Sequence, residues 1–138
     1  MAKALVVDCS IVLSWCFPDE GDKISEKTLE IACTKDLVAP SLLNLEFANG
    51  LVVAERRKRI TRSQFEELIT FFDDLFISFV EEEPVGADSQ IVKLARAHSL
   101  SVYDASYLAL AVERKLPLAT RDKVLQRAAS KCRLPNAQ

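Results

Sequence analysis

Two aspartates follow short apolar runs of the kind that form buried strands. Asp8 ends the run 4–7, and Asp122 comes shortly after the run 116–119. An unbroken apolar run of this length predicts a parallel strand that is buried on both faces. Open α/β sheets bind their ligands at the carboxyl ends of the strands. We therefore expect Asp8 and Asp122 to lie together at that edge of a sheet.

Two further carboxylates are predicted to reach the same edge from helices. Asp104 stands where an apolar stretch gives way to an alanine-rich helix, which predicts that it is the N-cap residue of that helix. Glu46 lies in an apolar helical stretch that is capped by Ser41, and Asn49 shares its helix face. A glutamate with apolar neighbours needs a partner if it is buried. We therefore expect four carboxylates at one site.

Such a group of carboxylates favours metal-ion chemistry. Like charges within a few ångströms raise each other's pKa, so the group is unfavourable without a cation. Oxygen ligands without cysteine or histidine select Mg²⁺, or Mn²⁺, over zinc. Divalent ions that are held by carboxylates and open to water suit phosphodiester hydrolysis. Taken singly, Asp104 and Asp122 could be helix caps and Asp8 a turn residue, so it is their shared edge that favours a metal site.

The elements that must position these residues alternate along the chain. Strands are predicted over 4–7, 37–40, 77–80 and 116–119, with an added edge strand over 132–134. Helices are predicted over 11–15, 23–35, 42–58, 61–75, 87–98 and 105–115, and again from 123 onward. The expected buried residues of two of these helices are Ile24, Leu29, Ile31, Ala32 and Cys33, and Tyr103, Tyr107, Leu108, Ala111 and Val112. The alternation implies an α/β fold of three layers, α/β/α, with a small central parallel sheet in a single domain, residues 1–138.

Length and composition limit the alternatives. The 138 residues suffice for one domain with one core. No apolar run approaches the roughly 18 residues of a membrane helix, and the first apolar run is too short for a signal peptide, so we expect a cytoplasmic protein. The cysteines have no C-x-x-C spacing, which favours free thiols over a zinc site or disulfides. The lone His98 is expected to be a structural residue at a helix end.

Basic residues gather in two clusters, although the net charge of −2 gives no overall attraction to nucleic acid. Solvated helix faces would explain either cluster alone. Two basic patches beside an acidic site would also suit a phosphate-backbone substrate. The candidate phosphate contacts are Arg56, Arg57, Lys58, Arg121, Lys123 and Arg127.

Four sequence blocks together resemble the PIN-domain nucleases. The blocks are Val6-Val7-Asp8-x-Ser10, Pro40-x-x-x-x-x-Glu46-x-x-Asn49, Val102-Tyr103-Asp104-Ala105-x-Tyr107-Leu108-Ala109-Leu110-Ala111 and Pro117-Leu118-Ala119-Thr120-x-Asp122. The third and fourth blocks resemble in particular the VapC toxins of bacterial toxin–antitoxin pairs. The resemblance spans nearly the whole chain. It implies a PIN fold and a magnesium-dependent endoribonuclease, a toxin that hydrolyses RNA.

The resemblance also implies residue roles and partners. It carries over an acidic quartet of Asp8, Glu46, Asp104 and Asp122. The polar positions that support the quartet through hydrogen bonds are matched by Ser10, Asn49 and Thr120. A homodimer is implied, as is an antitoxin protein whose tail occupies the active-site groove. One departure is Gly50, where alanine is commoner and which weakens the local helix by about 1 kcal/mol.

Other classes of protein place similar residues after a first strand. A phosphatase-like domain needs a second aspartate two residues after Asp8, where Ser10 stands. A receiver-like domain needs a second acid near the first and a lysine after a late strand, and the segment 120–122 fits this poorly. A catalytically silent PIN-like module that binds only RNA or a protein stays open, although the intact quartet argues against it.

Overall fold

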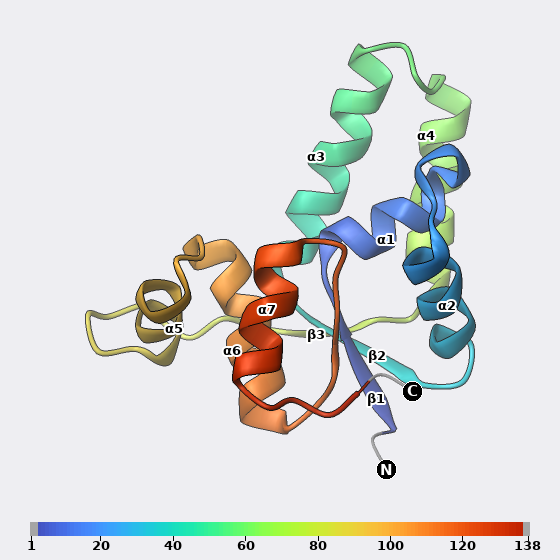
Figure 1. Cartoon of the computed structure of the whole chain (residues 1–138). Coiled ribbons are helices and arrows are strands. Elements are labelled where there is room, and N and C mark those ends of the chain that lie inside the picture. The colour runs from blue at the N-terminus through green and yellow to red at the C-terminus, as the bar shows by residue number, and fades with distance from the viewer. Residues whose placement is uncertain (1–2, 137–138) are drawn as a thin grey trace.

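The computed structural model describes residues 3–136, which are built around a parallel sheet (Figure 1). Its strands are β1 (Ala4–Val7), β2 (Asp36–Pro40), β3 (Ser78–Val80) and β4 (Leu118–Ala119). They lie in the order β3-β2-β1-β4, and each neighbouring pair is parallel. All the carboxyl ends therefore meet at one edge. This confirms the predicted α/β class and the small central parallel sheet.

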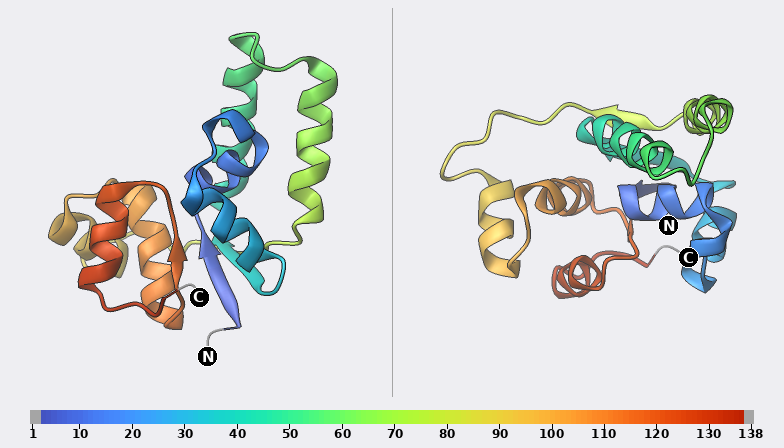
Figure 2. Two further views of the ribbon diagram at one scale, coloured as in Figure 1. Left: turned by 45° about the vertical axis from the view of Figure 1, so that its right-hand side comes forward. Right: turned by 90° about the horizontal axis from the view of Figure 1, so that it is seen from above.

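Helices cover both faces of this sheet. They are α1 (Cys9–Cys16), α2 (Lys23–Ala32), α3 (Leu42–Arg56), α4 (Arg62–Asp74), α5 (Gln90–His98), α6 (Val102–Arg114) and α7 (Lys123–Lys131), with a short 3-10 turn η1 (Pro18–Glu20). Figures 1 and 2 show α5, α6 and α7 on one side of the sheet and α1, α2 and α4 on the other. Helices α3 and α4 extend together beyond the carboxyl edge as an arm. No helix within residues 3–136 has the length and apolar character to span a bilayer.

Two apolar clusters hold the layers together. The first surrounds β1, whose residues Leu5, Val6 and Val7 are fully buried. It reaches the arm through Phe47 of α3 and Phe72 of α4, whose rings stack with their centroids 4.1 Å apart. The second cluster joins α5, α6 and α7 through small and branched side chains. Helix α6 belongs to both clusters, since its Tyr107, Leu110 and Ala111 lie in the first.

Helix α2 packs partly through polar side chains. Of its expected apolar buried face, Ile31 and Ala32 pack against the first cluster, but the other residues do not. Ser25 and Thr28 are the buried residues of α2, whereas Ile24 and Leu29 are 44% and 37% exposed. Cys33, which was also expected to be buried, is exposed. The reason is a hydrogen bond from the Ser25 hydroxyl to the hydroxyl of Ser14 in α1, which joins the two helices through polar groups.

Two further predictions also differ from the structure. Helix α5 begins at Gln90 and not at residue 87, because the Ser89 hydroxyl accepts the Val92 N–H and caps the helix there. The expected edge strand over 132–134 is absent from the described sheet. Arg133 has a φ of 56°, which reverses the chain, and the Leu134 N–H donates to the carbonyl of Ala129.

Candidate active site

Asp8 lies at the carboxyl end of β1, where it is only 4% exposed. Its Oδ1 accepts the Ile11 N–H at 3.0 Å, which makes it the N-cap of α1, and the Ser10 hydroxyl at 2.7 Å. Its Oδ2 accepts the Thr120 hydroxyl. Burial raises the pKa of Asp8 to about 6, hydrogen bonds to the carboxylate oppose the rise, and the charge of Asp104 adds to it. The hydrogen bonds thus fix the orientation of the carboxylate, while burial makes its ionised form unfavourable.

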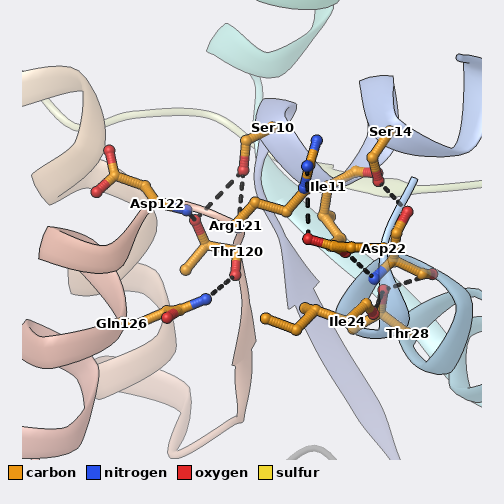
Figure 3. Close-up of polar contacts among 11 residues, drawn as sticks. Ser10, Ile11, Ser14, Asp22, Ile24, Thr28, Thr120, Arg121, Asp122 and Gln126 are labelled. Carbon is orange, nitrogen blue, oxygen red and sulfur yellow. Dashed lines mark hydrogen bonds and ion pairs between the residues drawn. The ribbon is translucent and has the colours of Figure 1, made fainter. Parts of the chain in front are cut away.

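Ser10 and Thr120 join the two chain segments that meet beside Asp8. The Ser10 hydroxyl accepts the Arg121 N–H at 3.0 Å, and the Thr120 hydroxyl accepts the Asp122 N–H at 3.0 Å (Figure 3). The start of α1 and the start of α7 are therefore tied together across the sheet edge. Ser10 and Thr120, two of the three expected supporting residues, therefore hydrogen-bond to the Asp8 carboxylate and to the chain beside Asp122. Asn49 differs, because it is exposed on α3 and makes no hydrogen bond to Glu46 in the described chain.

Glu46 lies in α3 beyond the same edge and has a partner that the sequence did not reveal. The Tyr107 hydroxyl of α6 donates to Glu46 Oε1 at 2.5 Å. Burial raises the pKa of Glu46, the Tyr107 hydrogen bond lowers it, and the charge of Asp104 raises it further. The Tyr107 side chain is 1% exposed, and burial also raises its pKa, so its hydroxyl stays protonated as a donor. A buried tyrosine usually needs a hydrogen-bond partner for its hydroxyl. The expected burial of Tyr107 was therefore the one sign in the sequence that it would bond to another polar group.

Asp104 occupies the first turn of α6, but it is not the N-cap residue that was expected. Ser101 caps the helix, since its hydroxyl accepts the Asp104 N–H at 3.0 Å. A carboxylate in the first turn is still favoured by the helix dipole. Burial and the charge of Asp122 raise the pKa of Asp104. Tyr103, predicted to be buried, is 66% exposed.

Asp122 is the N-cap residue of α7. A helix cap was one of the two roles expected for it, and a metal ligand was the other. Its Oδ1 accepts the N–H groups of Val124 at 2.8 Å and Leu125 at 3.1 Å. The other carboxylate oxygen accepts no hydrogen bond within residues 3–136. Asp122 can therefore cap the helix and still offer one oxygen to a ligand.

The four carboxylates form one electrostatic group with Asp104 in the middle. Asp104 raises the pKa of both Asp8 and Glu46, and Asp122 raises that of Asp104. No lysine or arginine in the described chain lowers the pKa of Asp8, Glu46 or Asp104. As they stand, no three acidic, histidine or cysteine side chains within residues 3–136 are close enough to form a finished metal cluster.

The donor set of this group fits a hard divalent cation. Carboxylates supply only oxygen ligands, which suit Mg²⁺ or Mn²⁺. Burial is the main cause of the raised pKa values of Asp8, Glu46 and Asp104, and the charges of neighbouring acids add to it. A bound cation would offset that repulsion between the carboxylates.

The thiols near the site are unsuited to nucleophilic chemistry. Burial raises the pKa of Cys9 and of Cys16 to about 12, so neither forms a thiolate at neutral pH. Cys132 lies 3.7 Å from the ring of His98 at the end of α5, which fits a structural histidine. All four cysteines are free, as expected.

The predicted phosphate contacts divide into three places. Arg56, Arg57 and Lys58 lie at the tip of the arm, about 15 Å along α3 from Glu46 at the standard helical rise. The Arg121 side chain points away from Asp122 across α1, where its Nη2 is 3.5 Å from Asp22 Oδ2 (Figure 3). Lys123 and Arg127 are exposed on α7.

Glu82 is a structurally important residue that the sequence analysis missed. Its two carboxylate oxygens accept the Ser41 hydroxyl at 2.5 Å and the Leu42 N–H at 2.8 Å. Partial burial raises its pKa, but these hydrogen bonds outweigh that effect and leave the pKa lowered. Ser41 was expected to cap α3 with its own side chain, and Glu82 performs that role instead. The sequence of segment 81–84 indicated only that a strand ends there. Nothing in it indicated that Glu82 would bond to Leu42, which is 40 residues away in the chain.

Gly50 has a packing role in the helix that carries Glu46. A Cβ atom at this position would lie 2.9 Å from Leu13 Cδ1 of α1. The glycine therefore permits the close approach of α1 and α3 at this point. This explains why a residue with poor helix propensity stands there.

Comparison with known proteins agrees with this architecture. The PIN domain matches residues 5–131, from β1 to the end of α7. Ribonuclease VapC3 of Pyrobaculum aerophilum is 32% identical over 125 residues, covering 88% of this chain and 91% of that protein. The crystal structure of PAE2754 from Pyrobaculum aerophilum shares the fold, with a TM-score of 0.63 at 23% identity over 93% of this chain and 86% of that one. This chain therefore belongs to the PIN domain family.

Proposed function

We propose that this protein is a metal-dependent endoribonuclease that acts as a single domain. The observation that carries the proposal is a group of four carboxylates centred on Asp104. Its charge adds to burial in raising the pKa of Asp8 and Glu46, and the charge of Asp122 adds to burial in raising the pKa of Asp104. Asp8, Glu46 and Asp104 would hold Mg²⁺ or Mn²⁺. Asp122 would complete that site or support a second ion.

The residues around the carboxylates have distinct supporting roles. A bound divalent ion supplies an activated water and stabilises the charge that develops on the phosphate. Ser10 and Thr120 keep the Asp8 carboxylate in one orientation, and Tyr107 does the same for Glu46. These side chains are preorganised, because each is held by a hydrogen bond that exists before substrate arrives.

The similarity to Ribonuclease VapC3 supports a biological context for this activity. We infer that the protein is the toxin of a VapBC-like toxin–antitoxin pair and acts as a homodimer on cytoplasmic RNA. Its antitoxin would neutralise it by occupying the active-site groove. The basic residues that would contact RNA phosphates are Arg56, Arg57, Lys58, Arg121, Lys123 and Arg127.

The test exchanges the central carboxylate for its amide. Asp104→Asn keeps the side-chain shape, and the backbone N–H of residue 104 that donates to the Ser101 cap is unchanged. RNA cleavage in the presence of Mg²⁺ should fall by orders of magnitude, while thermal unfolding shows that the protein stays folded. The matched control is Asp73→Asn, which changes an exposed carboxylate of α4 and should leave cleavage unchanged. An Asp104→Asn protein that cleaves RNA at the wild-type rate would refute the nuclease proposal and favour a silent binding module.

A further inference from the structure

A basic groove lies between the C-terminal end of α5 and α7. Its volume is about 350 Å³, and it is lined by His98, Ser99, Val124, Arg127, Ala128 and Lys131. Its floor is the second apolar cluster, in which Leu125 and Ala128 of α7 pack against α5 and α6. Figures 1 and 2 show α5 and α7 both placed against α6. The groove is therefore built between well-packed helices.

The two helices that border the groove carry only positive side-chain charge. Neither α5 (QIVKLARAH) nor α7 (KVLQRAASK) contains an aspartate or glutamate. Arg127 and Lys131 are exposed, and neither forms an ion pair with an acid in the described chain. They stand four residues apart on one face, an arrangement of like charges that weakens an isolated helix. The C-terminal dipole of α5 opposes anion binding, but its half charge is smaller than two full cations.

One end of the groove is lined by residues that lie close along the chain to the acidic edge of the sheet. Val124 is two residues after Asp122, and Ser99 is two residues before Ser101, the cap of the turn that holds Asp104. Along α7, Arg127 lies about 7.5 Å from Asp122 and Lys131 about 13.5 Å, at the standard rise per residue. A strand whose phosphate reaches the carboxylates could thus continue along α7 with its next phosphates beside these two cations.

We propose that this groove binds the sugar–phosphate backbone of single-stranded RNA on one side of the cleaved bond. The inference rests on the proposed nuclease function and adds a path for the substrate. Arg127 and Lys131 each contact a backbone phosphate, and His98 lines the wall that faces them. Lys123 and Arg121 do not line the groove, so the phosphate contacts within it come from Arg127 and Lys131.

The experiment measures RNA binding without cleavage. The full-length Asp104→Asn protein is titrated into a fluorescent, mixed-sequence, single-stranded RNA over a series of salt concentrations. The groove variant adds Arg127→Gln and Lys131→Gln. The matched control adds Arg114→Gln and Lys115→Gln, which remove the same charge from the opposite, exposed end of α6. Thermal unfolding confirms that all the proteins are folded.

The salt dependence decides the outcome. The slope of log K against log salt is negative, and the loss of two phosphate contacts should make it shallower by about 1.4. The control variant should keep the slope of the parent protein. A groove variant that binds RNA with the parent slope and affinity overturns the inference, including the case in which the groove serves an acidic protein segment. The proposed nuclease function is judged separately, by whether Mg²⁺-dependent cleavage requires Asp104. Either conclusion can therefore fail while the other stands.

Discussion

Replacing Asp8 by asparagine should stabilise the metal-free protein at neutral pH. Burial raises the pKa of Asp8 from 3.8 to about 6 in the folded state. Between pH 4 and 6 the folded protein therefore holds the Asp8 proton more tightly than the unfolded chain does. The free energy of unfolding must fall as pH rises through this range, and the loss is complete above about pH 6.

The magnitude follows from the same pKa difference. A difference of about two pH units corresponds to about 3 kcal/mol of lost stability at pH 7. Asp8→Asn removes this charge but keeps an oxygen that can accept the Ile11 N–H and the Ser10 hydroxyl. Its amide can donate to the Thr120 hydroxyl, which exchanges its role from donor to acceptor. The variant should thus be more stable than wild type at pH 7 by up to about 3 kcal/mol.

The assay is urea unfolding from pH 4 to pH 8 with a chelator present. The difference in unfolding free energy between variant and wild type isolates Asp8 from the other acids, which titrate in both proteins. The control is Asp36→Asn, an exposed carboxylate at the opposite end of the sheet. A variant that is less stable than wild type at pH 7, or a difference that does not change between pH 4 and 7, would show that the Asp8 charge is compensated within the fold.

Four other changes test individual contacts of the site. Glu82→Gln should lower the free energy of unfolding by about 1 kcal/mol at pH 7, because it weakens the cap of α3. Since the folded-state pKa of Glu82 is lowered, wild type should lose this advantage as pH falls. Equal urea midpoints for the two proteins at pH 7 would contradict the prediction. Tyr107→Phe should cost about 1.5–3 kcal/mol at pH 7, since a half-buried carboxylate loses its donor; chemical unfolding measures this, and unchanged stability would exclude the hydrogen bond in solution. If the site binds Mg²⁺ with a millimolar dissociation constant, a ten-fold excess of Mg²⁺ should raise the free energy of unfolding of wild type by roughly 1.4 kcal/mol, or its melting temperature by a few degrees. The rise should be smaller for Asp122→Asn. An equal rise in melting temperature for both proteins would show that Asp122 does not bind the ion. At an open helix position, Gly→Ala stabilises a protein by about 1 kcal/mol. Gly50→Ala should give less than this gain, because the new Cβ meets Leu13 of α1. A full gain of about 1 kcal/mol in thermal unfolding would show that α1 moves away at no cost.

Several features followed from the sequence because their causes are local. The apolar runs before Asp8 and Asp122 produced β1 and β4, and the capping box at Thr61 and Gln64 opens α4 as predicted. Asp122 caps α7 from within its own turn. In both caps the interacting groups lie two or three residues apart, where spacing alone determines which groups can meet, and each strand follows from the apolar pattern within its own run.

The contacts that shape the site depended on tertiary structure. Glu46 and Tyr107 are 61 residues apart, and Asp8 and Thr120 are 112 apart, so no local spacing could reveal either pair. Their meeting depends on the strand order, which places β4 beside β1 and brings α3 and α6 to one edge. The sequence by itself identified the carboxylates and the strands and helices that carry them. The packing of the helices decided which polar groups reach those carboxylates, because burial makes every unmet hydrogen bond costly and leaves few arrangements that satisfy all of them.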